Sequence, residues 1–369
     1  MIRVSKSIVG KKESDAVENV IRNVGYLAMG DEVRSFESEL EAYIGNSDYT
    51  ATCVNTGTSA LHLALESVTN RGDEVLVPSF TFVATYQAIT AAGCKPVSCE
   101  INEDTLLIDL SDAEGRVTSK TKVILPVLYA SNPHNLLTLY AFAKRFNLRV
   151  IEDAAHAFGC NYNGKKIGAQ GDIVCFSFDG IKNITSGEGG AIVTSDKSVT
   201  DYVKDARLLG VESDTEKRYK GERSWDFDVS VQGYRYHMSN IFAAIGRVQL
   251  KRFEKDFAIS RKNIAKKYTE LLKDNGNIIL IDMDYDNIVP HIFPIRVSNN
   301  LRDQLFDVLA DKSIQCGMHY KPNHLLTKFK TSYSLPVSEK AYSQILTLPL
   351  HPELTNSDVE KICKIINKL

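Results

Sequence analysis

The sequence predicts an α/β fold: a mostly parallel seven-stranded sheet flanked by helices, followed by a smaller α/β C-terminal domain. Between residues 50 and 195, seven short apolar runs alternate with helical segments, which is the pattern of βαβ units. After residue 195 this rhythm changes and long helical segments dominate. A chain of 369 residues suggests two domains, which we place at 1–250, with residues 1–30 contributing to the cleft, and at 251–369.

The first part of the chain gives the clearest pattern of elements. A helix is predicted at 31–44, because Val33, Phe36 and Leu40 share one face and Asp31 stands in position to cap it. The predicted strands lie at 52–54, 74–77, 96–99, 123–127, 149–151, 172–178 and 191–194, and the early helices between them at 58–68, 81–92 and 135–146.

The second part is more irregular. The polar stretch 212–236 contains the only tryptophan and predicts an extended loop or hairpin. The pattern then predicts a long helix from 239 to about 273, a strand near 289–297, a helix at 300–311, an irregular stretch at 316–324 and a final helix at 358–369.

Composition excludes several classes of function. The net charge is −2, with 43% hydrophobic and 24% charged residues, so a general electrostatic affinity for nucleic acid or acidic membranes is not expected. No apolar run is long enough to span a membrane, and the N-terminus lacks the apolar stretch of a secretory signal. Seven cysteines without a Cys-x-x-Cys pair favour reduced thiols over disulfides or a metal site. We therefore expect a cytoplasmic protein.

The first candidate site segment is Asn55–Leu61, which runs from a strand end through glycine into a helix. Ligands of open parallel sheets bind at the carboxyl ends of the strands. Backbone N–H groups, hydroxyls and the positive end of the helix dipole make this segment a candidate phosphate site. An ordinary Ser/Thr helix cap explains the same residues.

Two further segments carry ionisable side chains. The strand at 149–151 leads into two carboxylates, the second of them Asp153, and His156 follows within one turn. Asp153 alone also fits a helix cap. Lys182 comes shortly after the sixth predicted strand. A lysine in a cleft beside an apolar strand end loses its proton readily and forms Schiff bases, although single loop lysines are usually solvated.

A glycine-dense segment, Ser186–Gly190, completes the set, and a hairpin turn explains it equally well. Together the four segments offer a phosphate cradle, a strand-end carboxylate, hydroxyls and a lysine. Pyridoxal 5′-phosphate (PLP) matches all of them, because its aldehyde suits the lysine, its ring nitrogen the carboxylate and its phosphate the helix N-terminus. A dinucleotide-binding module is disfavoured, since Gly-x-Gly-x-x-Gly is missing.

From about residue 30 onwards the sequence resembles the DegT/StrS family of fold-type-I PLP enzymes, the nucleotide-sugar aminotransferases. The resemblance covers nearly the whole chain. The matching motifs are Gly57–His62, Pro78–Thr85, Glu152–Ala157, Phe176–Phe178 with Lys182-Asn183, Gly187–Gly190, Gly233-Tyr234 with Met238–Asn240, and Leu348–Pro352.

The resemblance implies a role for each matching position. Lys182, the Schiff-base lysine, and Asp153, which binds the pyridinium nitrogen, are the catalytic residues. Phe82 and His156 lie against the two faces of the cofactor ring. The phosphate is held by Gly57, Thr58, Ser59 and Ser177.

The family completes the phosphate site with a residue of the neighbouring subunit, which implies a homodimer with shared active sites. That residue is commonly an Asn within a Gly-Tyr-x-Tyr-x segment. This chain has Gly233–His237 there, without Asn. Arg235 or His237 is therefore expected to substitute.

Lysine rather than histidine at position 182 favours transamination over dehydration, because a freed lysine amine can move the proton. We expect L-glutamate as donor and a nucleotide-linked keto-deoxysugar as acceptor, namely dTDP-4-keto-6-deoxyglucose aminated at C4 for an O-antigen or other lipopolysaccharide sugar. The expected substrate contacts are Tyr26, Met29, His319, Tyr320 and Lys321.

Three alternatives stay open. One is C3 amination of a 3-keto-6-deoxyhexose nucleotide. Another is transamination of a small keto acid, which a late carboxylate-binding arginine would support, but residues 303–369 contain none. The third is a PLP-binding regulatory protein without turnover, against which the intact Lys182, Asp153 and Ser177 argue.

Overall fold

The computed structural model describes residues 1–220, 222 and 225–369. Its main sheet has seven strands in the order β1-β9-β8-β5-β4-β2-β3. Strand β9 runs antiparallel to both of its neighbours, and the other pairs are parallel. This confirms the predicted sheet. The strands are β1 Thr50–Val54, β2 Glu74–Pro78, β3 Lys95–Cys99, β4 Thr121–Ile124, β5 Arg149–Asp153, β8 Ile173–Ser177 and β9 Gly190–Thr194.

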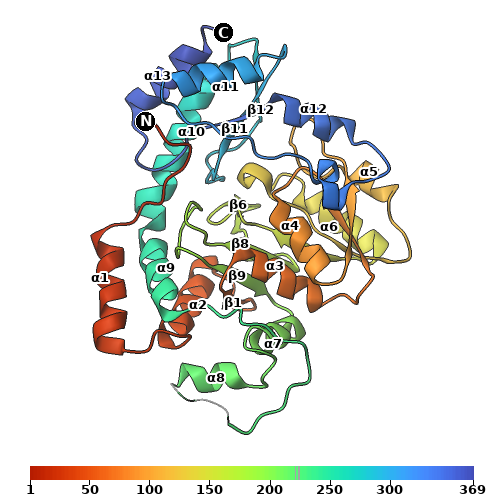
Figure 1. The fold of residues 1–369 in the computed structure, drawn as a ribbon, viewed down its shortest axis with the longest axis vertical. Coiled ribbons are helices and arrows are strands. Elements are labelled where there is room, and N and C mark those ends of the chain that lie inside the picture. Colours follow the sequence, from red (N-terminus) through yellow and green to blue (C-terminus); the bar gives the residue numbers. More distant parts are fainter. Residues whose placement is uncertain (221, 223–224) are drawn as a thin grey trace.

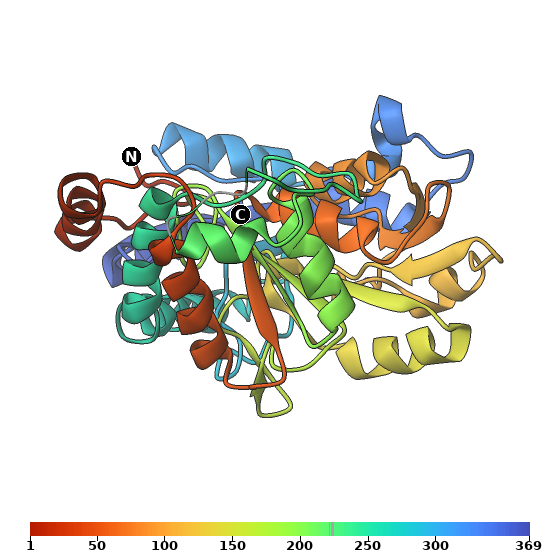
Figure 2. The same ribbon diagram turned by 90° about the horizontal axis from the view of Figure 1, so that it is seen from below.

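Helices cover both faces of this sheet (Figure 2). Side chains alternate along each strand, so that on β8 Ile173 and Cys175 face one helical layer while Val174 and Phe176 face the other. The first layer contains α3 Gly57–Glu66, α4 Val83–Ala91 and α7 Lys197–Ala206. The second contains α2 Asp31–Ile44, α5 Leu110–Glu114, α6 Leu136–Phe146 and α9 Asn240–Arg252.

The predicted helix at 239–273 is interrupted. Helix α9 continues through a π-helical turn, Phe253–Ala258, into α10 Ile259–Leu272, and the two helices follow one another along one side of the molecule (Figure 1). Helix α10 packs on a three-stranded antiparallel sheet with its own apolar core. The elements of this part are β10 Ile278–Leu280, β11 Phe293–Val297, α11 Arg302–Asp311, α12 Pro336–Gln344, β12 Ile345–Leu348 and α13 Asn356–Ile366.

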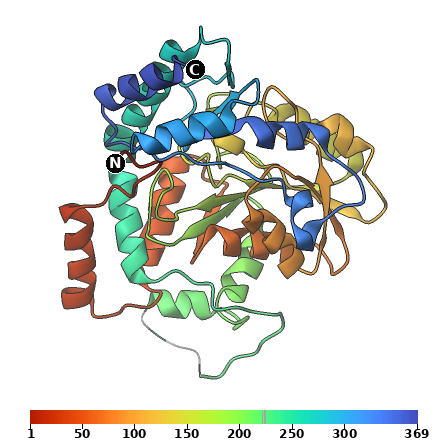
Figure 3. The same cartoon turned by 45° about the horizontal axis from the view of Figure 1, so that its top comes forward.

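The N-terminal segment contains a helix that the apolar pattern did not predict, α1 Lys11–Asn19, followed by a π-helical turn at Val20–Val24. Figures 1 and 3 both show α1 beside α9, where Glu13 accepts from Arg252 at 2.6 Å. Before it, Ile2 bridges Ile314 of the C-terminal part. The division at residue 250 stays a prediction.

The prediction for residues 212–236 is wrong at one point, because α8 forms at Asp214–Tyr219. Residues 221 and 223–224 of this stretch lie outside the described part. The Tyr219 hydroxyl enters a buried network with Glu37 and Arg207, which a polar sequence alone does not reveal. A smaller difference concerns α2, where Gly30 is the N-cap and Asp31 is the first helical residue.

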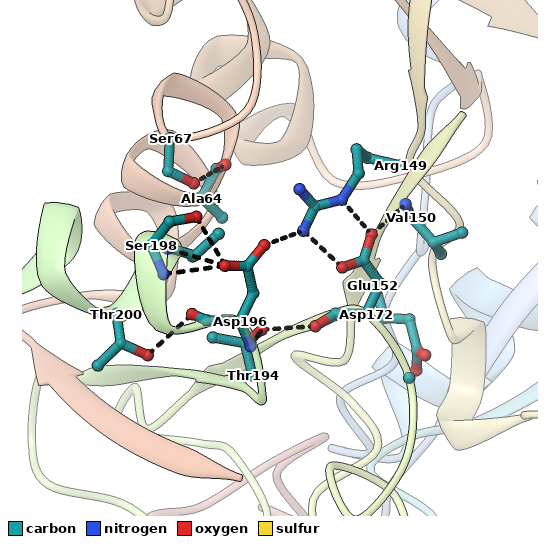
Figure 4. Close-up of polar contacts among 12 residues, drawn as sticks. Ala64, Ser67, Arg149, Val150, Glu152, Asp172, Thr194, Asp196, Ser198 and Thr200 are labelled. Atoms are coloured by element: carbon teal, nitrogen blue, oxygen red, sulfur yellow. Dashed lines mark hydrogen bonds and ion pairs between the residues drawn. The ribbon is translucent and has the colours of Figure 1, made fainter. Parts of the chain in front are cut away.

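A half-buried group of ion pairs lies at the amino end of β5, opposite the end that carries Asp153. The Arg149 guanidinium donates to both carboxylate oxygens of Asp172, at 2.7 and 2.6 Å, and to Asp196 at 3.0 Å (Figure 4). Asp172 also accepts from the Val150 N–H at 3.0 Å. Bidentate pairing of this kind holds strand ends in register, so β5, β8 and β9 form a firm base for the side chains at their other ends.

Candidate active site

A cavity of about 340 Å³ opens at the carboxyl ends of β5 and β8, beside the N-termini of α3 and α4. Nine of the residues predicted from the sequence line this cavity together. Its lining residues include Gly57, Thr58, Phe82, Asp153, His156, Ser177, Lys182, His319 and Tyr320.

Asp153 is the last residue of β5, and its carboxylate is almost fully buried. Oδ2 accepts from the Thr85 hydroxyl at 2.9 Å, and Oδ1 accepts from the Ala155 N–H at 3.2 Å. Burial raises the pKa of Asp153, while these two donors and the charge of Lys182 oppose the rise. Asp153 is therefore a buried carboxylate in the lining of a cavity that also contains the Lys182 amine.

Lys182 follows β8 in a turn where its backbone N–H donates to the Asp179 carbonyl at 3.1 Å. Burial lowers the pKa of its ammonium, and the nearby Asp153 and Asp179 limit that fall. A lowered pKa makes the neutral, nucleophilic amine more accessible at neutral pH. The neighbouring Asn183 donates its Nδ2 to the carbonyls of Phe158 and Val289, each at 3.0 Å, which anchors the turn.

The predicted phosphate cradle is built on two close backbone approaches. Helix α3 begins at Gly57, after Thr56 has capped it by accepting from the Ser59 N–H at 3.0 Å. A Cβ on Gly57 would lie 2.7 Å from the Ser177 Cβ, so glycine alone lets these two segments meet. Similarly, a Cβ on Gly190 would lie 2.5 Å from the Thr56 carbonyl oxygen. The start of α3, at Gly57 and Thr58, lines the cavity together with Ser177, and a helix N-terminus attracts anions.

Aromatic rings form a further part of the cavity wall. Phe82 is 55% exposed at the rim, with its ring centroid 5.5 Å from that of Tyr320. His156 is buried, and its Nε2 hydrogen-bonds the Tyr320 hydroxyl at 3.1 Å. Burial and the charge of Lys182 lower the pKa of His156 well below its usual range, so this ring is neutral. His319 is neutral for the same reasons, its pKa being lowered to about 4.

Several predicted residues do not line the cavity. Met29 is fully buried in the core of the second helical layer, so the structure does not offer it the substrate contact expected from the sequence. Tyr26 lies near the start of α9, where its carbonyl accepts from Asn240 at 2.8 Å. Lys321 is exposed outside the cavity lining. None of residues 1–30 lines the cavity, so their expected contribution to the cleft is not seen within this chain.

The remaining phosphate residues are also outside the lining. The Ser59 hydroxyl donates to Asn55 Oδ1 at 2.6 Å. Arg235 is exposed, and His237 pairs through its backbone with Val54 at the end of β1. Burial and nearby arginines lower the pKa of His237 to about 4. The roles expected for these three residues stay predictions.

Sequence reasoning missed part of the lining. Thr85 donates to Asp153 from the first turn of α4, and Thr81 contacts the Thr85 hydroxyl. Asp179, Ile181 and Glu188 add to the walls. Thr81 and Thr85 lie in a motif that had been noted only for its resemblance. Their four-residue spacing indicates that the two hydroxyls lie close to each other, but it does not indicate the contact of Thr85 with Asp153.

The donor set fits PLP. The buried Asp153 offers a partner for a basic ring nitrogen, and the amine of Lys182 shares the cavity with it. The N-terminus of α3 suits an anion, and glycines at 57 and 190 allow the segments around it to pack closely. Among the described residues, no group of three or more His, Cys, Asp or Glu side chains is placed to hold a metal ion. No helix in the described ranges is long and apolar enough to cross a membrane.

Comparisons with known proteins agree with this chemistry. Residues 7–367 match the DegT/DnrJ/EryC1/StrS aminotransferase family. The protein MJ1066 of Methanocaldococcus jannaschii, described as uncharacterised, is 33% identical over 98% of this chain and 95% of its own. The sugar aminotransferase CalS13 from Micromonospora echinospora has a similar structure, with a TM-score of 0.91 and 27% identity over 100% of both chains.

A third similar protein bears on the cofactor. Spr1654 from Streptococcus pneumoniae has been solved in a PMP form, which is 28% identical with a TM-score of 0.90 and covers 100% of this chain and 97% of that one. It has also been solved in a PLP form. The family match over nearly the full length, together with these structures and the cavity's residues, shows that this chain belongs to the DegT/DnrJ/EryC1/StrS aminotransferase family and is a PLP-dependent enzyme.

Proposed function

We propose that this enzyme transfers an amino group from L-glutamate to C4 of dTDP-4-keto-6-deoxyglucose, giving dTDP-4-amino-4,6-dideoxyglucose. The observation that carries this proposal is the joint placement of Lys182 and Asp153 in one cavity that the rings of Phe82, His319 and Tyr320 also line. The product is of the kind used in an O-antigen or another lipopolysaccharide, made in the cytoplasm.

In this proposal Lys182 and Asp153 are the catalytic residues. Bound PLP supplies an electron sink for the carbon that loses its proton. The Asp153 carboxylate accepts a hydrogen bond from the protonated ring nitrogen and keeps that proton in place. The Lys182 amine holds the cofactor until the amino donor arrives, and once freed it carries a proton between the substrate carbon and the cofactor.

Other residues would bind and orient the cofactor. The N-terminus of α3, with Gly57, Thr58 and Ser59, and the Ser177 hydroxyl would hold the phosphate. Phe82 and His156 would lie against the two ring faces. A neutral His156 suits this position, because a cation there would repel the protonated ring nitrogen.

The rim supports a sugar as acceptor. The exposed side chains of the lining include the apolar Phe82 and Ile181 beside Thr58 and Glu188, and the rings of His319 and Tyr320 add hydrogen-bonding groups. Among the described residues that line the cavity, none is an arginine. Lys321 is proposed to meet the diphosphate, and Tyr26 is proposed to contact the substrate.

We propose that the enzyme is a homodimer in which Arg235 or His237 completes the partner's phosphate site. The stretch next to these residues exposes Trp225, which is 85% exposed, together with Phe227 and Val229. Large apolar side chains gathered on a surface mark an interaction site. Mixing Lys182→Ala subunits with subunits changed at both Arg235 and His237 should restore activity, because one site per heterodimer keeps only intact parts. A fully active monomer would contradict this arrangement.

The substrate proposal is tested with a panel of nucleotide-linked 3-keto and 4-keto deoxysugars supplied with L-glutamate, and products are identified by mass and NMR. We expect the dTDP-linked 4-keto sugar to give the highest kcat/KM. A strong preference for the 3-keto sugar would move the proposal to C3 amination. No activity on any nucleotide sugar would overturn it.

A further inference from the structure

Two buried hydroxyls, those of Thr81 and Thr85, form a short chain of hydrogen bonds that ends on Asp153. We call this chain the relay. The Thr81 and Thr85 hydroxyl oxygens are 3.0 Å apart, and Thr85 Oγ1 donates to Asp153 Oδ2 at 2.9 Å. Both threonines are almost fully buried, and both line the cavity. Thr81 precedes the N-cap of α4 and Thr85 lies in its first turn, so the start of this helix places one hydroxyl behind the other.

The direction of the relay follows from counting protons. A hydroxyl can donate one hydrogen bond, and the Thr85 hydroxyl donates its hydrogen bond to the carboxylate. Thr81 must therefore donate to Thr85. A hydroxyl that accepts a hydrogen bond becomes a better donor, so Thr81 strengthens the bond from Thr85 to Asp153.

The outer end of the relay is held by the C-terminal part of the chain. Asn323 is fully buried, and its Nδ2 donates to the Thr81 carbonyl at 2.8 Å and to the Ser79 carbonyl at 3.1 Å. The Ser79 hydroxyl is 2.7 Å from His324 Nδ1. These contacts fix the backbone at Thr81, so the Thr81 side chain is held beside the Thr85 hydroxyl.

We propose that Thr85, oriented by Thr81, is a positioning residue that keeps the Asp153 carboxylate ionised and aimed into the cavity. The inference rests on the proposed role of Asp153 as partner of the ring nitrogen. Without Thr85, the buried Asp153 Oδ2 would lack its hydroxyl donor, and burial would favour the protonated acid. A protonated acid could not hold a protonated ring nitrogen.

Other groups near Asp153 do not replace the relay. The titratable side chains that interact with it are Lys182, Cys175 and Tyr320. Of these only Lys182 carries a positive charge, and that amine is committed to the cofactor. The Ala155 N–H serves the other carboxylate oxygen.

The test measures the PLP dissociation constant of the apo-protein from about pH 5 to pH 9 by titration of its intrinsic fluorescence. Thr85→Val removes the hydroxyl and keeps the shape, so we expect affinity near pH 7 to fall roughly 10- to 100-fold. The acid-side loss of affinity should also move to higher pH, because removing a donor to the carboxylate raises its pKa. Thr85→Ser keeps the hydroxyl and should restore both properties.

Thr90→Val is the matched control. Thr90 lies on the same helix, and its hydroxyl donates only to the Tyr86 and Gln87 carbonyls, each at 3.2 Å. This variant should bind PLP as the unchanged protein does. If Thr85→Val does not fold, Thr81→Val replaces it, with a smaller change expected in the same direction.

The outcomes separate the relay from the proposed role of Asp153. If Asp153→Asn loses PLP affinity while Thr85→Val keeps it, the relay is wrong and the role of Asp153 stands. If Asp153→Asn also binds PLP normally, the role of Asp153 itself fails. If Thr85→Ser is as weak as Thr85→Val, the methyl group matters rather than the hydroxyl, and the inference is overturned.

Discussion

Replacing Asp153 by asparagine removes one negative charge from the cavity and leaves the shape of the side chain nearly unchanged. In the structure the Ala155 N–H and the Thr85 hydroxyl both contact this carboxylate. An amide can accept from Ala155 through its oxygen and donate its NH₂ to the Thr85 hydroxyl, so the fold should be retained.

The loss in cofactor binding is the loss of one charge-assisted hydrogen bond. Such bonds contribute about 1.5–3 kcal/mol, which corresponds to a PLP affinity roughly 10- to 100-fold weaker. The effect on kcat should be larger, because an amide cannot keep the ring nitrogen protonated and the electron sink is lost with that proton.

The same substitution should stabilise the apo-protein. Burial raises the pKa of Asp153 in the folded state, so the folded chain binds that proton more tightly than the unfolded chain. The free energy of unfolding then falls as the pH rises through the folded-state pKa. An asparagine does not pay this desolvation cost, so we expect a higher Tm for Asp153→Asn at about pH 8 and no difference near pH 3.

Three measurements check this prediction: steady-state kcat with glutamate as donor, PLP affinity by titration, and thermal unfolding of the apo-protein at both pH values. The account predicts low kcat, weaker PLP binding and a raised Tm at the higher pH. Near-normal turnover with unchanged PLP affinity would refute the role of Asp153. A Tm lowered at both pH values would refute the argument from burial.

Three further variants extend the account. Lys182→Ala should abolish turnover with glutamate, because a methyl group can neither hold the cofactor nor move a proton; any multiple-turnover activity would contradict this. Burial raises the pKa of Glu152 to about 7. The wild-type apo-protein should therefore lose stability relative to Glu152→Gln as the pH rises from about 4.5 to 7. The difference between their urea midpoints, measured across this pH range, checks this. Arg207→Met should lower the free energy of unfolding by about 3–5 kcal/mol in urea titration, because it leaves the Glu37 carboxylate buried without its 2.6 Å partner; a loss below about 1 kcal/mol would show that the network is not stabilising.

The sequence predicts well those features that are local in the chain. Each strand of the main sheet is a short apolar run in the sequence. Polar residues such as Asp153 and Ser177 stand at the carboxyl ends of these strands. Because parallel strands bring their carboxyl ends to one edge, segments far apart in the chain could be expected to share a site. The cavity contains the predicted Asp153, His156, Ser177 and Lys182.

Features that depend on contacts between distant segments could not be predicted. Met29 lies just before the predicted helix at 31–44, and packing turns its side chain into the core. Helix α8 forms in a polar stretch because Tyr219 meets Glu37, 182 residues away. Thr85 contacts Asp153 across 68 residues, and a single sequence contains no signal for that pairing.

The amine that holds the cofactor can be identified directly. The PLP-loaded protein is reduced with borohydride, digested, and its labelled peptide identified by mass spectrometry. The account predicts one labelled site, Lys182, and no stable label in Lys182→Ala. A label on any other lysine of the unchanged protein, or none after full loading with PLP, would contradict the assignment of this cavity as the active site.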